Sequence, residues 1–288
     1  TPNLGWFSAI LGGLMFGFGM TLGSGCGNKT LVRLGAGNLK SLVVLMFLGF
    51  FAYMTLRGLI GLARVEMEAL TVIDLKNSGL KTQGIPEILA TLFSMPLAAV
   101  SLATTVVIGG GLVLFAFKSA DFRSSTRDIA AGIIIGCLVI AAWYLTGVIG
   151  NDEFDPVPMS SFSFIAPAGD SLQYLMTFSG ASINFGIATV GGVIFGSFLM
   201  AVASKEFHFE AFSGTDDMLR HIIGGTLMGI GGVLSLGCTV GQGITGMSTL
   251  AVGSLLALVS IFTGGVYGMK YLEEGSLGGA LKAMLTRE

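Results

Sequence analysis

The stretch Leu22-Gly-Ser-Gly-Cys-Gly-Asn-Lys29 interrupts a long apolar segment, and its Gly-Cys pair recurs in the second half of the chain. When the chain is shifted by 212 positions, residues 10–26 align without a gap on residues 222–238. Eight of these seventeen positions are identical, namely Ile10, Gly12, Gly13, Gly17, Gly19, Leu22, Gly25 and Cys26 in the first copy. The chain therefore contains an internal repeat.

Each copy has the same predicted plan. An apolar, glycine-rich helix stops at a Gly-Cys turn, because clustered glycines weaken a helix, and a short helix follows whose first amides face the cysteine. A second long apolar segment then completes the unit. We expect repeat units at about 5–61 and 218–272 within a single integral membrane domain that covers residues 1–288.

The composition places the chain in a bilayer. Of its 288 residues 52% are hydrophobic and only 11% are charged, and the mean hydropathy is +0.83. A spanning helix needs about 20 apolar residues, and seven stretches approach that length: about 5–24, 40–61, 97–117, 128–149, 182–204, 218–236 and 251–270. The 45 glycines suit closely packed membrane helices and not the alternating strands of a barrel. The fold class is thus a polytopic all-α membrane protein.

Charge in the connections predicts the orientation. The connection 118–128 is basic and 205–220 also holds basic residues, so both are expected in the cytoplasm, whereas 150–170 carries acidic side chains and no lysine or arginine. Counting spans from these connections places the starts of 5–24 and 218–236 on opposite sides of the membrane. The two copies are then inverted, an arrangement typical of transporters, whose site lies where the halves meet. A miscount of one span would make the repeat parallel instead.

The connection 65–86 reads as an extramembrane loop, followed by a short helix that begins near Pro86. The second copy is preceded by the span 182–204, and nothing equivalent precedes Ile10. We therefore expect at least one further helix before Thr1 in the natural protein.

Broken helices inside a bilayer require a protein-lined or watery cavity, since backbone groups cannot remain unpaired in hydrocarbon. The amino ends of the two short helices favour an anion. A thiol adds a weak donor and a soft, polarisable sulfur, which suits an anion that itself contains sulfur. The predicted path is lined by residues of the two turns: Gly25, Cys26, Gly27, Asn28, Lys29 and Arg33 in the first, and Gly237, Cys238, Thr239 and Gln242 in the second.

Simpler roles compete with these assignments. Lys29 and Arg33 either attract the anion or extend to a membrane interface, and Gln242 either contacts substrate or caps its short helix. Cys137, without a turn or charge nearby, is expected to be an apolar filler. His208 and His221 are expected to be solvated.

Three ordered motifs resemble the YeeE/YedE family of bacterial inner-membrane transporters, which is linked to thiosulfate uptake. They are Gly25-Cys26 through Leu31-Val32-Arg33-Leu34-Gly35, the run from Asn184 to Phe198, and Gly237-Cys238-Thr239-Val240-Gly241-Gln242-Gly243. The resemblance implies an hourglass-shaped helical protein in which thiosulfate passes between cysteines, and a small cytoplasmic sulfurtransferase as partner. The family's Arg-Phe-Cys motif is not found in this chain.

We therefore expect a transporter, not an enzyme, with no cofactor or metal, that takes up a small sulfur-containing anion. No Gly-x-x-x-x-Gly-Lys-Ser/Thr loop indicates direct use of ATP. One alternative is a membrane thiol enzyme that relays sulfur as a cysteine persulfide. Another is a channel for a different small solute.

Overall fold

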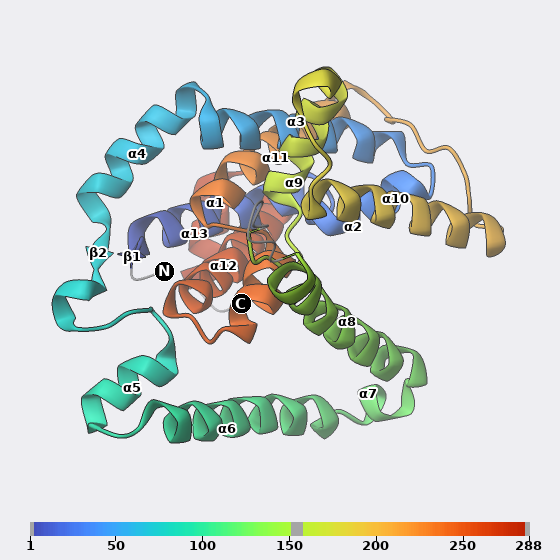
Figure 1. The fold of residues 1–288 in the computed structure, drawn as a ribbon. Helices are drawn as coiled ribbons and strands as arrows, with labels where there is room; N and C mark the ends of the chain where they lie inside the picture. The colour runs from blue at the N-terminus through green and yellow to red at the C-terminus, as the bar shows by residue number, and fades with distance from the viewer. Residues whose placement is uncertain (1–2, 151–157, 286–288) are drawn as a thin grey trace. The chain divides into compact units, whose positions relative to one another are not determined.

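The computed structural model describes residues 3–150 and 158–285, which are almost entirely helical (Figure 1). This confirms the expected all-α class. The chain divides into two compact units, with the two-residue strand β2 (Ile73–Asp74) at their boundary.

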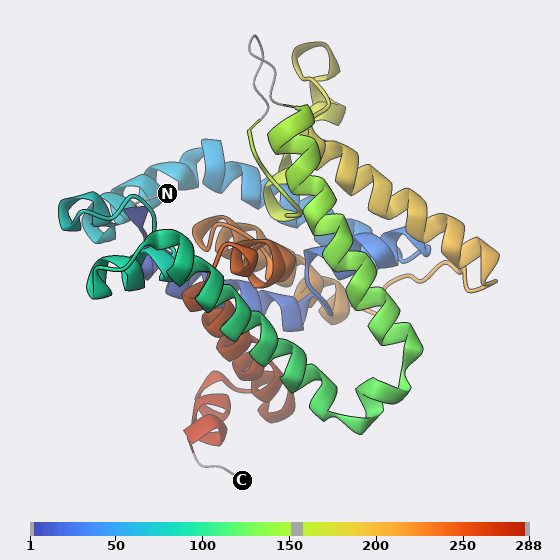
Figure 2. The ribbon, with the colours of Figure 1, turned by 60° about the horizontal axis from the view of Figure 1, so that its bottom comes forward.

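The first unit holds residues 3–4, 74–150, 158–162 and 248–252. Its elements are β1 (Asn3–Leu4), η1 (Leu75–Ser78), α5 (Ile85–Phe93), α6 (Leu97–Lys118), α7 (Ala120–Ser124), α8 (Thr126–Tyr144) and η2 (Leu145–Ile149). Figure 2 shows the two long helices α6 and α8 joined through the short α7. Pro86 lies in the first turn of α5, so the helix predicted at this proline is confirmed.

The second unit carries both Gly-Cys turns. Its elements are α1 (Trp6–Leu22), α2 (Gly27–Gly35), α3 (Leu39–Arg57), α4 (Leu59–Thr71), α9 (Ile165–Met176), η3 (Phe178–Gly180), α10 (Phe185–Ala203), α11 (Thr215–Leu234), η4 (Gly241–Gly246), α12 (Val252–Glu274) and α13 (Leu277–Leu285). In Figure 1, α11 (orange) lies among α1, α3 and α9.

Helices α1 and α11 cross in contact with opposite directions. A Cβ added to Gly12 would lie 2.6 Å from the carbonyl oxygen of Gly231, and one added to Gly19 would lie 2.8 Å from that of Gly224. The 212-residue shift converts the first of these contacts into the second. The pair of helices is therefore related by a twofold rotation, and glycine permits the close approach of the backbones.

Each of these helices also packs along the last long helix of the other copy, in the same direction. A Cβ on Gly17 would lie 2.1 Å from the Ile261 carbonyl oxygen in α12, and one on the equivalent Gly229 would lie 2.5 Å from the Leu48 carbonyl oxygen in α3. The first helix of each copy thus packs against the last long helix of the other copy: α1 packs against α12, and α11 packs against α3.

Within the described residues, six helical segments are long and apolar enough to cross a membrane: Trp6–Gly35, Leu39–Arg57, Leu97–Lys118, Thr126–Ile149, Phe185–Ala203 and Val252–Glu274. The count of seven was one too high by this measure. The expected span at 218–236 does form a helix, α11, but its first turns carry Asp216, Asp217, Arg220 and His221, which lower its hydropathy.

Two predicted loops contain helices. Helix α4 continues to Thr71, into the region assigned to the 65–86 loop. Helix α9 occupies residues 165–176 and includes Asp170, whereas the other acidic residues of the 150–170 connection, at positions 152, 153 and 155, lie outside the described residues. Both helices are shorter than a membrane span, so a search for long apolar segments does not detect them.

Candidate functional site

The two Gly-Cys turns have the same backbone hydrogen bonds. In the first, the Gly25 amide donates to the carbonyl of Met20 at 2.9 Å, and in the second the Gly237 amide donates to that of Gly232 at 2.8 Å. The residue before each of these glycines is left-handed, Ser24 at φ 60° and Leu236 at φ 59°. Each long helix therefore ends in a Schellman motif, with serine or leucine where glycine is usual.

Each cysteine begins the short helix that follows its turn. The Cys26 carbonyl accepts the Thr30 amide at 2.9 Å, and the Cys238 carbonyl accepts the Gln242 amide, at the equivalent position, at 2.8 Å. After Cys26 the chain forms the regular helix α2, as predicted. After Cys238 it passes into η4, whose wider π-helical turns were not predicted.

The Cys238 sulfur is enclosed by backbone amides. Cys238 is fully buried, and the Gly241 amide donates to its Sγ at 3.4 Å. The amides of Val240 and Phe164 also interact with this sulfur, and Cys26 influences it electrostatically. Cys26 itself is half-buried. The structure thus brings together the two cysteines that the repeat singled out.

The beginning of α9 lies against both turns, which the sequence did not predict. Phe164 precedes α9 and supplies an amide to the Cys238 sulfur. The side chains of Phe164 and Ile165 also border buried Gly27, within 3.9 Å of a Cβ added there. Three segments that lead into helices, at Cys26, Cys238 and Phe164, therefore converge. No motif in residues 158–165 distinguishes this segment in advance.

The two cations of the first turn have different surroundings. The Arg33 guanidinium donates to the Ser24 carbonyl at 3.2 Å and lies 3.8 Å from the Glu210 carboxylate. Exposed Lys29 has no ion pair with any described residue, and its aliphatic stem lies across Gly25. Arg33 thus stabilises the turn, while the charge of Lys29 has no counter-charge among the described residues.

Glu210 connects the loop after α10 to the start of α3. Its carboxylate lies 3.2 Å from the Lys40 ammonium and accepts a hydrogen bond from the Asn38 side chain, and its carbonyl accepts the Leu39 amide at 2.9 Å. The hydrogen bond from Lys40 holds the pKa of Glu210 below its ordinary value, and the nearby charges add to this effect while burial opposes it.

Asp217 extends this cluster to a histidine. The Asp217 carboxylate lies 3.0 Å from the Lys40 ammonium and 3.2 Å from His221 Nδ1. His221 is 5% exposed, so the expectation of a solvated side chain was wrong for this residue. The His221 ring also forms a hydrogen bond with the Asp217 carbonyl, one helical turn earlier, which holds the ring against the surface of α11. His208 is exposed, as expected.

Uncharged side chains hold the second turn. Buried Gln242 donates its side-chain amide to the Ser235 carbonyl at 2.5 Å, so it caps the end of the preceding helix α11 and not its own short helix, which was the capping role considered from the sequence. The Ser235 hydroxyl donates to the Gly231 and Gly237 carbonyls at 2.8 and 3.0 Å. The Thr239 hydroxyl faces the Met20 sulfur on α1 at 3.9 Å.

The remaining predicted residues are Asn28, half-buried on α2, and Cys137, which is exposed on α8 and so does not fill a packed interior of the described chain. Among the described residues, no group of three or more His, Cys, Asp or Glu side chains is arranged to hold a metal ion.

Several apolar spanning helices and a pair of interrupted helices that meet at buried or half-buried thiols define a multi-pass membrane protein of the transporter class. The chain belongs to the family described as "Sulphur transport", whose model matches residues 1–267. This confirms the resemblance to the YeeE/YedE family.

Two relatives carry the name Thiosulfate transporter TsuA. The one from Escherichia coli (strain K12) is 28% identical over 252 residues, which cover 83% of this chain and 67% of the relative. The one from Spirochaeta thermophila is 25% identical over 243 residues, which cover 83% of this chain and 69% of the relative.

Proposed function

We propose that this chain carries thiosulfate inward across a bacterial inner membrane, past Cys26 and Cys238. The observation that supports this most strongly is the pair of equivalent turns: each begins a short helix with a cysteine, and both border Phe164 at the start of α9. The names of the two relatives support thiosulfate as the substrate.

The site offers complementary contacts for the two ends of this ion. Backbone amides at the short helices suit the oxygens, and the thiols suit the terminal sulfur, to which an S–H group donates a weak hydrogen bond. Lys29 attracts the dianion to the first turn, which offsets part of the cost of removing it from water. Weak binding at two successive sites permits release, whereas a single deep site would retain the ion.

The halves of this transporter are the units of about 5–61 and 218–272, arranged as inverted repeats. The antiparallel crossing of α1 and α11 supports this assignment. We propose that the side chains lining the path are those of the two turns, including Asn28, Thr239 and Gln242, and that a small cytoplasmic sulfurtransferase receives the product.

The test is uptake of radiolabelled thiosulfate by proteoliposomes. Cys26→Ser and Cys238→Ser are each expected to reduce uptake at least tenfold, while the control Cys137→Ser retains it. Competition by sulfite and sulfate measures the preference for a terminal sulfur. Wild-type uptake by both turn variants would exclude the thiols from the mechanism.

The enclosure of Cys238 by amides also supports a second candidate, a persulfide relay. The amides favour a thiolate while burial of Cys238 opposes one, and a thiolate formed there would attack the outer sulfur of thiosulfate, form a cysteine persulfide anion and release sulfite. Mass spectrometry after incubation with thiosulfate then shows Cys238 heavier by one sulfur, about 32 Da. An unmodified cysteine in protein that is active in uptake favours hydrogen-bonded passage.

A further inference from the structure

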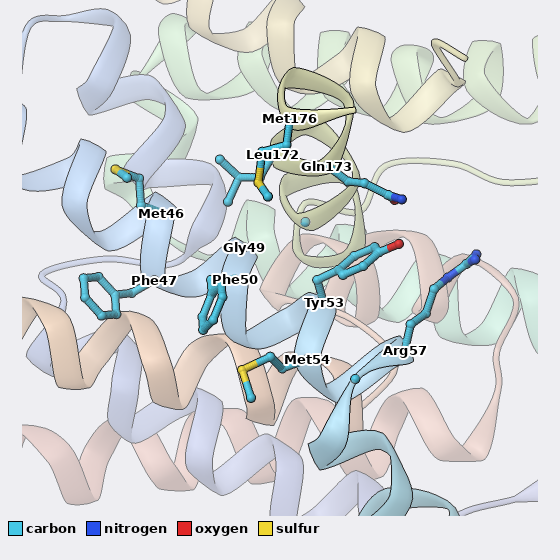
Figure 3. A pocket seen from close by; sticks show the side chains of 12 residues that line it. Met46, Phe47, Gly49, Phe50, Tyr53, Met54, Arg57, Leu172, Gln173 and Met176 are labelled. Atoms are coloured by element: carbon cyan, nitrogen blue, oxygen red, sulfur yellow. The ribbon is translucent and has the colours of Figure 1, made fainter. Parts of the chain in front are cut away.

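An apolar groove of about 560 Å³ runs along α3 beside α9 (Figure 3). Its α3 side is formed by Met46, Phe47, Gly49, Phe50, Tyr53, Met54, Arg57 and the following Gly58, and its α9 side by Gly169, Leu172, Gln173 and Met176. The two helices touch at Gly49, where an added Cβ would lie 2.6 Å from the Leu172 side chain. The groove is therefore built on a close helix pair.

The groove has an apolar end and a polar end. Figure 3 shows the hydroxyl of Tyr53, the amide of Gln173 and the guanidinium of Arg57 directed to the same side, away from Met46 and Phe47. Arg57 is exposed and forms no ion pair with any residue in the described part of the chain. An anionic group at this end would supply the negatively charged partner that Arg57 lacks among the described residues.

The length of the groove matches one leaflet of a bilayer. From Met46 to Arg57 is three turns of α3, roughly 16 Å at the helical rise. The hydrocarbon core of a bilayer is about 30 Å thick, so half of it is about 15 Å. Long basic side chains at the ends of spanning helices reach the headgroup level, where lipid phosphates are found.

We propose that this groove is a binding site for one anionic phospholipid. An acyl chain lies along Met46, Phe50 and Met54, and the Arg57 guanidinium binds the phosphate while Gln173 and Tyr53 donate hydrogen bonds to the headgroup. The site is separate from the two turns and does not depend on the proposed transport of thiosulfate. A lipid here stabilises the α3–α9 pair.

The test is native mass spectrometry of the delipidated full chain titrated with phosphatidylglycerol or with phosphatidylcholine of the same acyl chains. We expect one phosphatidylglycerol per chain, bound at least fivefold more tightly than phosphatidylcholine. Arg57→Gln removes this preference. The matched control Arg127→Gln, which removes an exposed arginine at the start of α8, retains it.

A second variant tests the apolar part of the groove. Met46→Trp fills the groove and is expected to weaken the binding of both lipids at least fivefold. Met200→Trp, at an exposed position on α10, is expected to leave their binding unchanged. Equal binding of the two lipids, or equal loss in Arg57→Gln and Arg127→Gln, overturns the proposal. A disulfide between two Met46→Cys chains also overturns the proposal, because a second copy of the chain then covers the groove.

Discussion

The two Gly-Cys turns share the same backbone hydrogen bonds, but the first has charged neighbours and the second has uncharged ones. The first is bordered by Lys29 and by Arg33 with its partner Glu210, whereas the second is held by Gln242 and Ser235, which carry no charge. Cys26 is half-buried and Cys238 is fully buried. The repeated sequence has therefore preserved the hydrogen bonds of the turn, while the burial of the cysteine and the charge around it have diverged.

The largest expected effect is a loss of stability when the close helix crossings are overpacked, and it tests whether the crossings α1–α12 and α11–α3 are equivalent. Gly17→Ala places a Cβ 2.1 Å from the Ile261 carbonyl oxygen, and Gly229→Ala places one 2.5 Å from that of Leu48. Overpacking of this kind costs about 1–3 kcal/mol or more, so both variants should lower the yield and melting temperature of folded protein. Gly110→Ala, where an added Cβ meets nothing within 4 Å, is the control. Damage from only one of the two variants would show that the crossings are not equivalent.

A second comparison removes the side chain at equivalent positions of the short helices. Gln242→Ala leaves the buried Ser235 carbonyl without its side-chain donor, at a cost of about 1–3 kcal/mol. Thr30→Ala removes a hydroxyl from the Cys26 carbonyl, which still accepts the Thr30 amide, and should cost about 0.5–1 kcal/mol. Melting temperatures in detergent measure both. A larger loss in Thr30→Ala would reverse the expected order.

A third comparison uses pH, because only the first turn is held by a titratable carboxylate among the described residues. The pKa of Glu210 is lowered, so its stabilising contribution is present above its ordinary value of 4.5 and is lost as the pH falls through the lower folded value. Glu210→Gln should cost about 0.5–1 kcal/mol at pH 7, since the side chain is 40% exposed.

When the pH falls from 6 to 3.5, Glu210→Gln should therefore lose less stability than the wild type does, as measured by thermal melting. The pKa of Asp217 is also lowered, first by a hydrogen bond from Lys40, so its own contribution is lost below its ordinary value of 3.8 and part of the acid sensitivity remains. An unchanged pH profile would show that Glu210 does not contribute through its charge.

The smallest expected effect concerns Lys29. Because this exposed side chain acts at a distance through screened charge, Lys29→Gln should raise the KM for thiosulfate about two- to fivefold at low salt and leave the melting temperature unchanged. The effect should fade at high ionic strength. Arg33→Gln is the contrasting variant, because it also removes the bond to the Ser24 carbonyl and should lower stability.

Glycine spacing and hydropathy were sufficient to predict the all-α membrane class and the internal repeat. The short helix after Cys26 was also predicted, because Gly35 to Asn38 ends it. The mode of helix termination was predicted less well: both turns place a residue other than glycine in the left-handed position, Ser24 and Leu236, which clustered glycines do not reveal.

The parts that the sequence did not predict depend on contacts distant along the chain. The amide of Phe164 reaches Cys238 only because α9 packs against α3, and the acidic partner of Arg33 comes from a loop more than one hundred residues later. Neither segment has a periodicity or motif of its own. Helices shorter than a span, such as α9, are also invisible to a search for long apolar runs.

The exchange of partners between the two copies constrains the order of biosynthesis. Gly17 in α1 packs against Ile261 in α12, and at about 5–20 residues per second a ribosome needs about 10–50 s to make the chain between them. For most of that interval α1 lacks both α11 and α12, so its glycine face must be covered by lipid, by other nascent helices or by an insertion factor. A chain whose translation stops before α12 would leave the face around Gly17 without its helical partner.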